Sequence, residues 1–201
     1  MTVHGPRCRP MPLARLIQGH LDQRTRVELP SDRSTPCGVL LPLLATETGY
    51  ELLYTLRTDS LPSHGGQVSF PGGKKAPHDQ GPEDTALREA SEELGIATGD
   101  VRVIGRLDDV YTLGVEYLIT PVVGVLDQGA TLSPNPGEVA DVFTVPVDLL
   151  GDPAHRGSVK KSWGGTQYDM PVITAGRHNI WGATYSITLN FLDCVRSARA
   201  D

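Results

Sequence analysis

Hydrophobic residues along this chain cluster in segments with the spacing of strands, separated by polar turns. The run CGVLLPLLA at 37–45 is apolar almost throughout and predicts a buried strand. The segment GYELLYTLR at 49–57 predicts a second strand, which pairs with the first across the turn TETG. Two more strands are expected at 101–112 and 115–126. Residues 142–150, VFTVPVDLL, predict the end of a strand followed by a short helical turn.

Helical spacing occurs near both ends of the chain and once in its middle. Residues 12–22 have the pattern of a short amphipathic helix, and 181–198 repeat apolar residues three and four positions apart. Residues 58–84 are rich in Gly, Pro and polar residues, which indicates mostly loop. Strand and helix signals therefore alternate, and the predicted fold class is α/β.

The chain shows no repeat and no composition shift that would mark a linker. Its 201 residues are enough for one sizeable hydrophobic core, so we expect a single domain over 1–201. The core of that domain would span about 37–150, preceded by an N-terminal extension at 1–36. The helix at about 181–198 would close the chain.

Composition and charge exclude some classes of protein. With 39% apolar and 21% charged residues, the chain is typical of a soluble globular protein, and no apolar run approaches the ~20 residues that span a bilayer. A net charge of -6 argues against a nucleic-acid partner, which would select a basic face. The three cysteines fit no zinc or redox spacing, and no signal-peptide core is present, so we expect a cytoplasmic protein with reduced thiols.

The middle helix is predicted from TALREASEELGI at 85–96. Pro82 suits a first helical position, and Gly95 suits a C-terminal stop. At about 100° per residue the apolar side chains share one face, which we expect to be buried. They are Ala86, Leu87, Ala90 and Leu94.

A narrow acidic stripe runs beside that apolar face. Glu89, Glu92 and Glu93 are spaced i, i+3 and i+4, and like charges at this spacing repel by roughly 0.2–0.5 kcal/mol per pair. Glu92 and Glu93 also lie in the last turn, where the helix dipole disfavours anions by roughly 0.3–1 kcal/mol. Arg88 can pair with Glu92 but cannot neutralise three carboxylates. Local arrangements that lower stability tend to mark functional sites.

Two interpretations of the stripe are open at this point. A solvated acidic surface is the simpler one. The other is a divalent-cation site, because oxygen ligands on a rigid helix suit hard cations such as Mg²⁺ or Mn²⁺. Just upstream, Gly72 and Gly73 in SFPGGK would let the backbone approach a ligand closely.

The segment from Gly73 to Ile96 resembles the Nudix box, the signature of the Nudix hydrolases. The usual form is G-x5-E-x7-R-E-U-x-E-E-x-G-U, with U an aliphatic residue, and every fixed position from Arg88 onward matches. The first half departs from it, because one extra residue separates Gly73 from Arg88. Gln80 then occupies the place of the first box Glu, where it can still hydrogen-bond Arg88 but brings no charge.

This resemblance implies a fold and a set of roles. The fold would be the Nudix α/β/α sandwich with a mixed sheet, covering roughly 37–150. Metal ligands would be Glu89, Glu92 and Glu93 together with the Gly72 carbonyl, and the cofactor would be Mg²⁺ or Mn²⁺. Arg88 would orient the carboxylates of the helix rather than touch substrate.

A second stretch narrows the resemblance to the coenzyme A pyrophosphatase branch. LLYTLRTDSLPSHGGQVSFPGG at 52–73 is similar to the segment that precedes the box in that branch, and NIWGATYSITLNFL at 179–192 is similar to its closing helix. The implied reaction is hydrolysis of the diphosphate of coenzyme A, or of a derivative, to 3′,5′-ADP and 4′-phosphopantetheine. The expected substrate-binding residues are Arg57, His64, Gln67, Phe70 and Lys74, although a core position is favoured for Phe70.

A catalytic base is also expected. Glu138, in SPNPGEVADVF, occupies the place of a downstream acid that serves this role in some members of the class, and Glu92 and Glu89 are alternatives. Asp108 and Asp109, in LDDVYT at 107–112, are expected near the same rim of the site, although turn capping is the more typical role of such a pair. The predicted catalytic residues are thus Glu92, Glu138 and Arg88.

Three other functions remain open from the sequence. The chain could be a Nudix pyrophosphatase for ADP-ribose or another nucleotide, or a non-catalytic nucleotide-binding Nudix domain, because the first half of the box is altered. The third option is an acidic protein-interaction surface. A small-molecule partner is expected in the first two, and the oligomeric state is open, with a homodimer as one option.

Overall fold

Strand β1 (Thr35–Thr46) lies at the centre of an eight-stranded sheet in the computed structural model, which describes residues 12–59, 65–114, 116–163 and 166–200. It pairs in parallel with β7 (Tyr117–Leu126) on one side. On the other side it pairs antiparallel with β2 (Gly49–Arg57) and β4 (Gly72–Lys74). Parallel and antiparallel pairs meet at the same strand, so the sheet is mixed, as predicted.

Short strands extend the sheet on both sides. Strands β3 (Val68–Ser69) and β8 (Val139–Pro146) pair with β2. Strands β5 (Val101–Arg106) and β6 (Val110–Tyr111) pair with β7. The predicted strand at 101–112 is therefore two strands, interrupted at residues 107–109.

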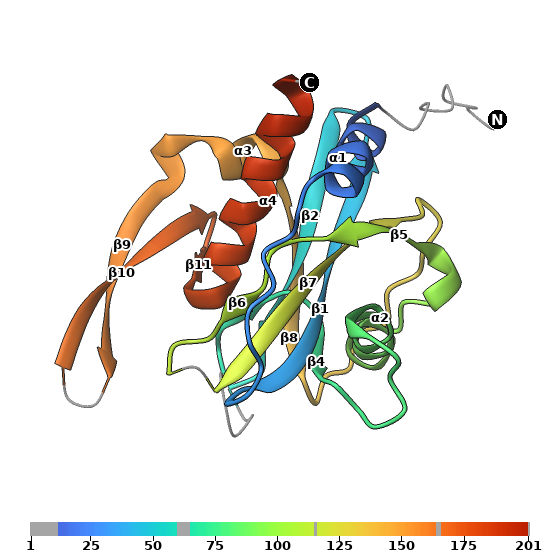
Figure 1. Cartoon of the computed structure of the whole chain (residues 1–201). Coiled ribbons are helices and arrows are strands. Elements are labelled where there is room, and N and C mark those ends of the chain that lie inside the picture. The colour runs from blue at the N-terminus through green and yellow to red at the C-terminus, as the bar shows by residue number, and fades with distance from the viewer. Residues whose placement is uncertain (1–11, 60–64, 115, 164–165, 201) are drawn as a thin grey trace.

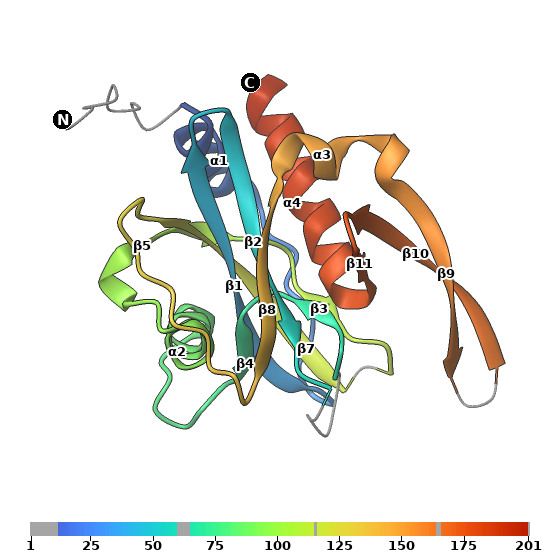
Figure 2. The same cartoon turned by 180° about the vertical axis from the view of Figure 1, so that it is seen from behind.

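Helices cover both faces of this sheet. Helix α2 (Pro82–Leu94) lies on one face, and α1 (Pro12–Gln23) and α4 (Gly182–Ala200) lie on the other (Figures 1 and 2). Two hydrophobic clusters correspond to these two faces, one built on α2 and one on α1 and α4. The predicted α/β/α sandwich is confirmed.

The apolar run of β1 is explained by this double coverage. Leu41 and Leu43 pack in the cluster of α1 and α4, whereas Leu40, on the opposite side of the strand, packs in the cluster of α2. All three are fully buried. A strand with helices on both faces needs apolar residues at consecutive positions, because successive side chains point to opposite faces.

A second sheet follows the first and was not predicted. Strands β9 (Arg156–Trp163), β10 (Thr166–Ala175) and β11 (His178–Trp181) form it after the short helix α3 (Val147–Gly151). It stands beside α4, with the β9–β10 hairpin projecting from the body (Figure 1). Both faces of much of this hairpin are exposed, so its sequence carries no alternation of apolar and polar positions. Two short 3-10 helices complete the elements, at Thr98–Asp100 and Pro153–His155.

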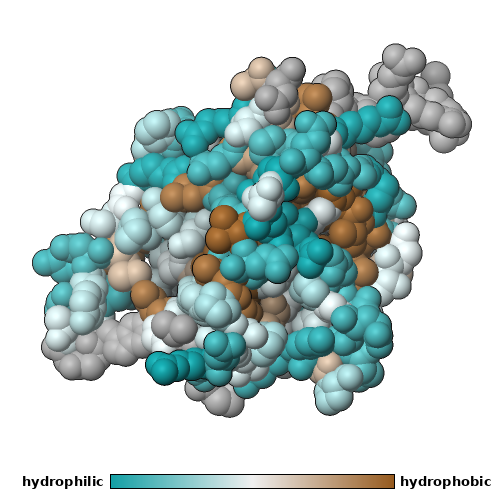
Figure 3. All heavy atoms as spheres, viewed as in Figure 1, coloured by the Kyte–Doolittle hydropathy of each residue, from teal (hydrophilic) through white to brown (hydrophobic). Residues whose placement is uncertain are grey.

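The face of the molecule that Figure 3 shows is largely hydrophilic. Figure 3 shows polar residues over most of one face, with separate apolar patches between them. The large apolar side chains that are most exposed come from different elements, namely Leu16, Val27, Leu113 and Tyr168. Within the described ranges, no helix combines the length and the apolar character that crossing a membrane requires.

Candidate active site

Helix α2 has the limits that its sequence predicted. It begins at Pro82, with Glu83 and Asp84 in the first turn, where the dipole favours anions. Its apolar side faces the sheet and buries Ala86, Ala90 and Leu94. The acidic stripe consequently lies along the border between the sheet and the solvent.

The C-terminus of α2 is closed by the loop between β7 and β8. Gly95 ends the helix in the left-handed region at φ 67°. A Cβ atom there would lie 2.9 Å from Cβ of Ser133, so the loop requires glycine at this position. The amides of Ser133 and Asn135 donate to the carbonyls of Leu94 and Glu93, at 2.7 and 2.8 Å. The last turn of the helix is thus attached to residues 133–138.

Arg88 is held by Asp79. Its Nε donates to Oδ1 of Asp79 and its Nη2 donates to Oδ2, both at 3.1 Å, which makes a two-bonded ion pair. Gln80 has no part in this contact. Its side-chain amide donates to the His78 carbonyl, and its backbone amide donates to Asp84. The expectation that Gln80 would bond Arg88 is wrong.

Asp79 is built into the structure around the start of α2. It is buried, and its Oδ2 accepts hydrogen bonds from the Ala76 amide at 2.8 Å and the Thr85 hydroxyl at 2.9 Å. The Arg88 guanidinium, aided by these donors and opposed by burial, holds the pKa of Asp79 well below its usual range. Asp79 therefore stays ionised at all physiological pH values.

The spacing from Gly73 could have identified Asp79. It stands six residues after Gly73, as the first box Glu does, so the extra residue lies between this acid and Arg88. A count of eight residues back from Arg88 leads to Gln80 instead. An Asp has one methylene fewer than Glu, and the longer loop brings it to the same guanidinium.

The remaining donors of Arg88 reach the helix carboxylates and the loop. Nη2 lies 2.8 Å from Oε1 of Glu89 and donates to the Lys74 carbonyl at 3.0 Å. Nη1 donates to Oε2 of Glu92 at 3.1 Å. Arg88 thus contacts Glu89 and Glu92 of the acidic stripe, and its role in orienting them for catalysis stays a prediction.

Glu93 is the buried member of the stripe, only 2% exposed. Oε1 lies 3.4 Å from Nη1 of Arg57, which is a long contact, and Oε2 is buried without a hydrogen-bond partner. Burial raises the pKa of Glu93 to about 7; Arg57 opposes that shift, and the charges of Glu89 and Glu138 add to it. Arg57 and a backbone hydrogen bond from Gly72 compensate this buried anion only in part, because its pKa is still raised.

Glu89 lies directly against the backbone of the glycine pair. A Cβ atom on Gly73 would lie 2.4 Å from the carboxyl carbon of Glu89, so no other residue type fits there without moving the glutamate. Burial raises the pKa of Glu89, with Arg88 opposing and the nearby charges of Glu92 and Glu138 adding to the shift. Glycine at 73 is what allows the carboxylate and the backbone to meet.

Glu138 joins the same cluster from the β7–β8 loop. Its charge adds to the raised pKa of both Glu89 and Glu93, although it comes from a different element of the fold. The Glu138 carbonyl accepts the Thr58 amide at 3.0 Å, and Oε1 accepts Nδ2 of Asn135 at 3.1 Å. The structure therefore brings the predicted downstream acid to the acidic helix.

The donor chemistry of this cluster fits a divalent cation. In the described part of the chain no three such side chains converge as a metal-binding group, and the carboxylates of the stripe pair with Arg88 and Arg57. Oε2 of Glu93 is nevertheless a buried carboxylate oxygen without a hydrogen-bond partner, and such an oxygen is a hard donor of the kind that divalent cations prefer. Glu92 is the exposed member, with 56% of its side chain accessible. The metal-binding roles of these residues and of the Gly72 carbonyl stay predictions.

The predicted substrate-binding residues have different surroundings. Arg57 lies at the end of β2 against Glu93, and Gln67 accepts its backbone amide at 3.0 Å. Phe70 is 3% exposed and stacks on Tyr54 at 4.6 Å, so it belongs to the core rather than to an open binding surface. The Lys74 amine lies 5.2 Å from the centre of the Tyr117 ring. His64 falls outside the described residues.

Asp108 and Asp109 hold the N-terminal segment instead of entering the site. Oδ1 of Asp108 accepts the Val27 amide, and both of its oxygens lie close to Arg24. Asp109 contacts Arg26 and accepts the Leu29 amide. These contacts attach residues 24–29 to the sheet edge, so the pair holds a segment that is distant in sequence and does not cap its own turn.

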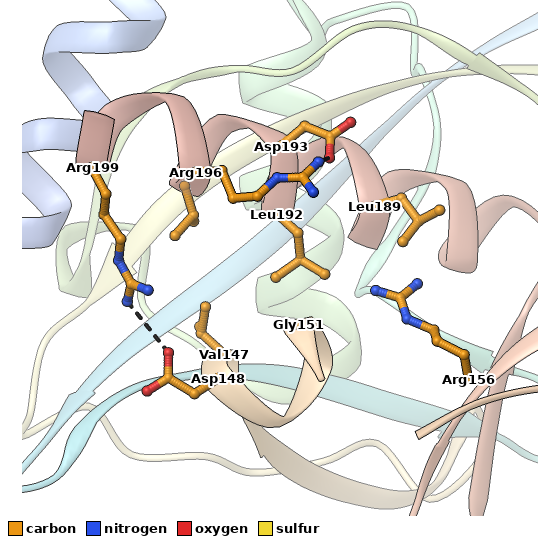
Figure 4. A pocket seen from close by; sticks show the side chains of 10 residues that line it. Val147, Asp148, Gly151, Arg156, Leu189, Leu192, Asp193, Arg196 and Arg199 are labelled. Carbon is orange, nitrogen blue, oxygen red and sulfur yellow. Dashed lines mark hydrogen bonds and ion pairs between the residues drawn. The ribbon is translucent and has the colours of Figure 1, made fainter. Parts of the chain in front are cut away.

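Two cavities, of about 410 and 460 Å³, lie away from the acidic helix. The first lies between α3 and α4, where Arg199 bridges to Asp148 and Leu192 points into the space (Figure 4). The second lies beside β8 and the turn between β10 and β11. Neither is lined by a residue predicted for catalysis or binding.

Known proteins match both the sequence and the fold. The family described as the NUDIX domain matches residues 36–162. The chain is 40% identical to "Uncharacterized Nudix hydrolase NudL" of Photorhabdus laumondii, over 78% of this chain and 83% of that protein. It is 41% identical to "Mitochondrial coenzyme A diphosphatase NUDT8" of Mus musculus, over 82% of this chain and 80% of the relative. A MutT/nudix family protein from Enterococcus faecalis shares the fold, with a TM-score of 0.54 at 14% identity, over 94% of this chain and 71% of that one.

Proposed function

The chain belongs to the Nudix hydrolase family, and we propose that the bond it cleaves is the diphosphate of coenzyme A or of a coenzyme A derivative. The products would be 3′,5′-ADP and 4′-phosphopantetheine. Support comes from the segment 52–73, which resembles the coenzyme A branch and ends at the acidic helix, and from relatives at 41–42% identity that are named coenzyme A diphosphatases. The observation that carries the proposal is the contact of Arg57, from that segment, with Glu93 of the box.

In this proposal, Glu89, Glu92 and Glu93 hold a divalent cation, Mg²⁺ or Mn²⁺, together with the Gly72 carbonyl. When bound, the cation supplies charge neutralisation for the diphosphate and acidifies water. Arg88 fixes the direction of the carboxylates through its ion pair with Asp79. A residue that holds metal ligands in place from behind, as Asp79 does through Arg88, tunes those ligands and is needed for full activity.

Substrate contacts and proton transfer are assigned to the chain's own side chains. Arg57 holds the diphosphate, because a guanidinium can donate two parallel hydrogen bonds to two oxygens of a phosphate. Water attacks one phosphorus, the bridging P–O bond breaks, and the bridging oxygen leaves with the other phosphate. Glu138 accepts the proton of the attacking water, because it is the acid that approaches the cluster from outside the helix.

Product analysis tests this function. The purified protein is incubated with coenzyme A and Mg²⁺ or Mn²⁺, in parallel with ADP-ribose and a nucleoside triphosphate, and Glu93→Gln serves as the inactive control. We expect 3′,5′-ADP from coenzyme A as the fastest reaction and no product from the variant. Faster turnover of ADP-ribose or the triphosphate would contradict the substrate assignment while leaving the acidic site in place.

A further inference from the structure

Asn135 uses every polar group it has to connect the acidic helix with Glu138. Its amide donates to the Glu93 carbonyl at 2.8 Å, and its own carbonyl accepts the amides of Glu138 and Val139 at 3.0 and 2.9 Å. Oδ1 accepts the Gly137 amide at 3.0 Å, and Nδ2 donates to Oε1 of Glu138 at 3.1 Å. One side chain therefore closes the turn and also binds the carboxylate at its end.

The backbone of Glu138 is held from the opposite side as well. The Thr58 amide, just after β2, donates to the Glu138 carbonyl at 3.0 Å, and the Thr58 hydroxyl donates to the Gly137 carbonyl at 3.2 Å. With the main chain fixed at both ends of the turn, the remaining freedom of Glu138 is in its side chain. The hydrogen bond from Asn135 holds Oε1 of the Glu138 carboxylate. Oε2 takes no part in this bond.

We propose that Asn135 is a positioning residue, which directs the Glu138 carboxylate toward Glu89 and Glu93 so that one of its oxygens can take the proton of the attacking water. This inference rests on the proposed function, because it needs Glu138 to be the base. Only a primary amide meets both requirements here, since the turn needs an acceptor and the carboxylate needs a donor from the same short side chain.

A single-atom substitution separates these two roles. Asn135→Asp keeps an oxygen that accepts the Gly137 amide, so the turn is retained, but it replaces the donor with an oxygen that repels Glu138. Asn135→Ser keeps a weaker acceptor for the turn and cannot reach the carboxylate. Ser133→Ala is the matched control in the same loop, because the contact of Ser133 with α2 is made by its backbone amide.

Steady-state kinetics with the substrate found by product analysis tests the inference. We expect Asn135→Asp and Asn135→Ser to lower kcat by about tenfold or more with KM within about twofold, and Ser133→Ala to match the native protein. In Asn135→Asp the acid limb of the kcat profile should also move to higher pH, since a carboxylate beside another carboxylate protonates more readily. Thermal unfolding confirms that the variants are folded.

A double-mutant cycle with Glu138→Gln completes the test. If Asn135 acts through Glu138, Asn135→Asp lowers kcat little further once Glu138 is Gln. Effects that multiply, or a native pH profile in Asn135→Asp, would show that Asn135 only shapes the loop. Full activity of Glu138→Gln alone would overturn the base assignment and the inference together. Failure of the coenzyme A assignment is a separate result, because the cycle runs equally on another diphosphate.

Discussion

Nη1 of Arg57 lies 3.4 Å from Oε1 of Glu93, and each of these two partly or wholly buried side chains keeps one polar atom without a partner, Nε of Arg57 and Oε2 of Glu93. The contact is long for a charged hydrogen bond, which normally lies near 2.7–2.9 Å. The two side chains therefore offset each other's charge, but each keeps a polar atom without a hydrogen bond. Each partner remains able to bind something stronger, a cation for Glu93 and a phosphate for Arg57.

Glu93→Gln is expected to stabilise the protein when metal is chelated. The pKa of Glu93 is raised to about 7, so the folded state binds a proton more tightly than the unfolded state does. The protonated form therefore contributes its full stability below the pKa of the unfolded state. That contribution is lost as the pH rises through the folded-state pKa of about 7. At about pH 8 we expect the variant to exceed the native protein by on the order of 1–3 kcal/mol.

Urea denaturation in EDTA measures this difference. At about pH 4 the two proteins should have similar stability, because Glu93 is then protonated in both the folded and the unfolded state. Glu92→Gln, at an exposed position of the same helix, is the control and should change little. Equal stability of the native protein and Glu93→Gln at about pH 8 would mean that the buried Glu93 charge does not destabilise the folded protein.

The same variant should bind a diphosphate more tightly in the absence of metal. Removing the Glu93 charge releases Arg57, whose guanidinium then has no carboxylate to hold it. We expect methylenebisphosphonate, titrated calorimetrically in EDTA, to bind Glu93→Gln several-fold more tightly than the native protein. In Glu93→Gln combined with Arg57→Gln the gain should vanish.

Glu92→Gln controls for the general loss of negative charge in this titration. It removes one carboxylate from the same stripe but does not contact Arg57. An equal gain in Glu92→Gln would show that the effect is not specific to the contact between Arg57 and Glu93.

Asp79→Asn should lower activity strongly, whereas Gln80→Ala should not. The Asp79 carboxylate makes two bonds to Arg88, and Arg88 in turn orients Glu89 and Glu92. We expect a loss of about 10–100-fold in kcat/KM for Asp79→Asn and less than about twofold for Gln80→Ala, measured side by side. The opposite order would return the role of the first box acid to position 80.

Gly73→Ala should weaken metal binding because its methyl group takes the place of the Glu89 carboxylate. The added Cβ would lie 2.4 Å from the carboxyl carbon, so the glutamate must move. We expect the affinity for Mn²⁺, measured by electron paramagnetic resonance, to fall about tenfold or more. Gly129→Ala, where a Cβ meets nothing within 4 Å, is the matched control. Native affinity in Gly73→Ala would exclude Glu89 as a ligand.

The sequence by itself determined the central strands, the acidic helix and its limits. In each of these elements, the local sequence pattern favours the same structure as the packing around it does. The apolar run at 37–45 is buried on both faces, and Pro82 and Gly95 bound α2 as helix-end chemistry requires. The i, i+3, i+4 spacing of Glu89, Glu92 and Glu93 places them on one stripe whatever surrounds the helix.

The tertiary structure decided which residues contact that stripe where counting along the sequence left more than one choice. Asp79 replaced Gln80 as the partner of Arg88 because an inserted residue shifts the count along the loop, and contact depends on distance in space. Arg57 and Glu138 reach the helix from strand ends that are far away in sequence, and the turn held by Asn135 exists only where the β7–β8 loop caps α2. Exposed strands β9 and β10 left no periodic signal, because solvent on both faces imposes no alternation of apolar and polar residues.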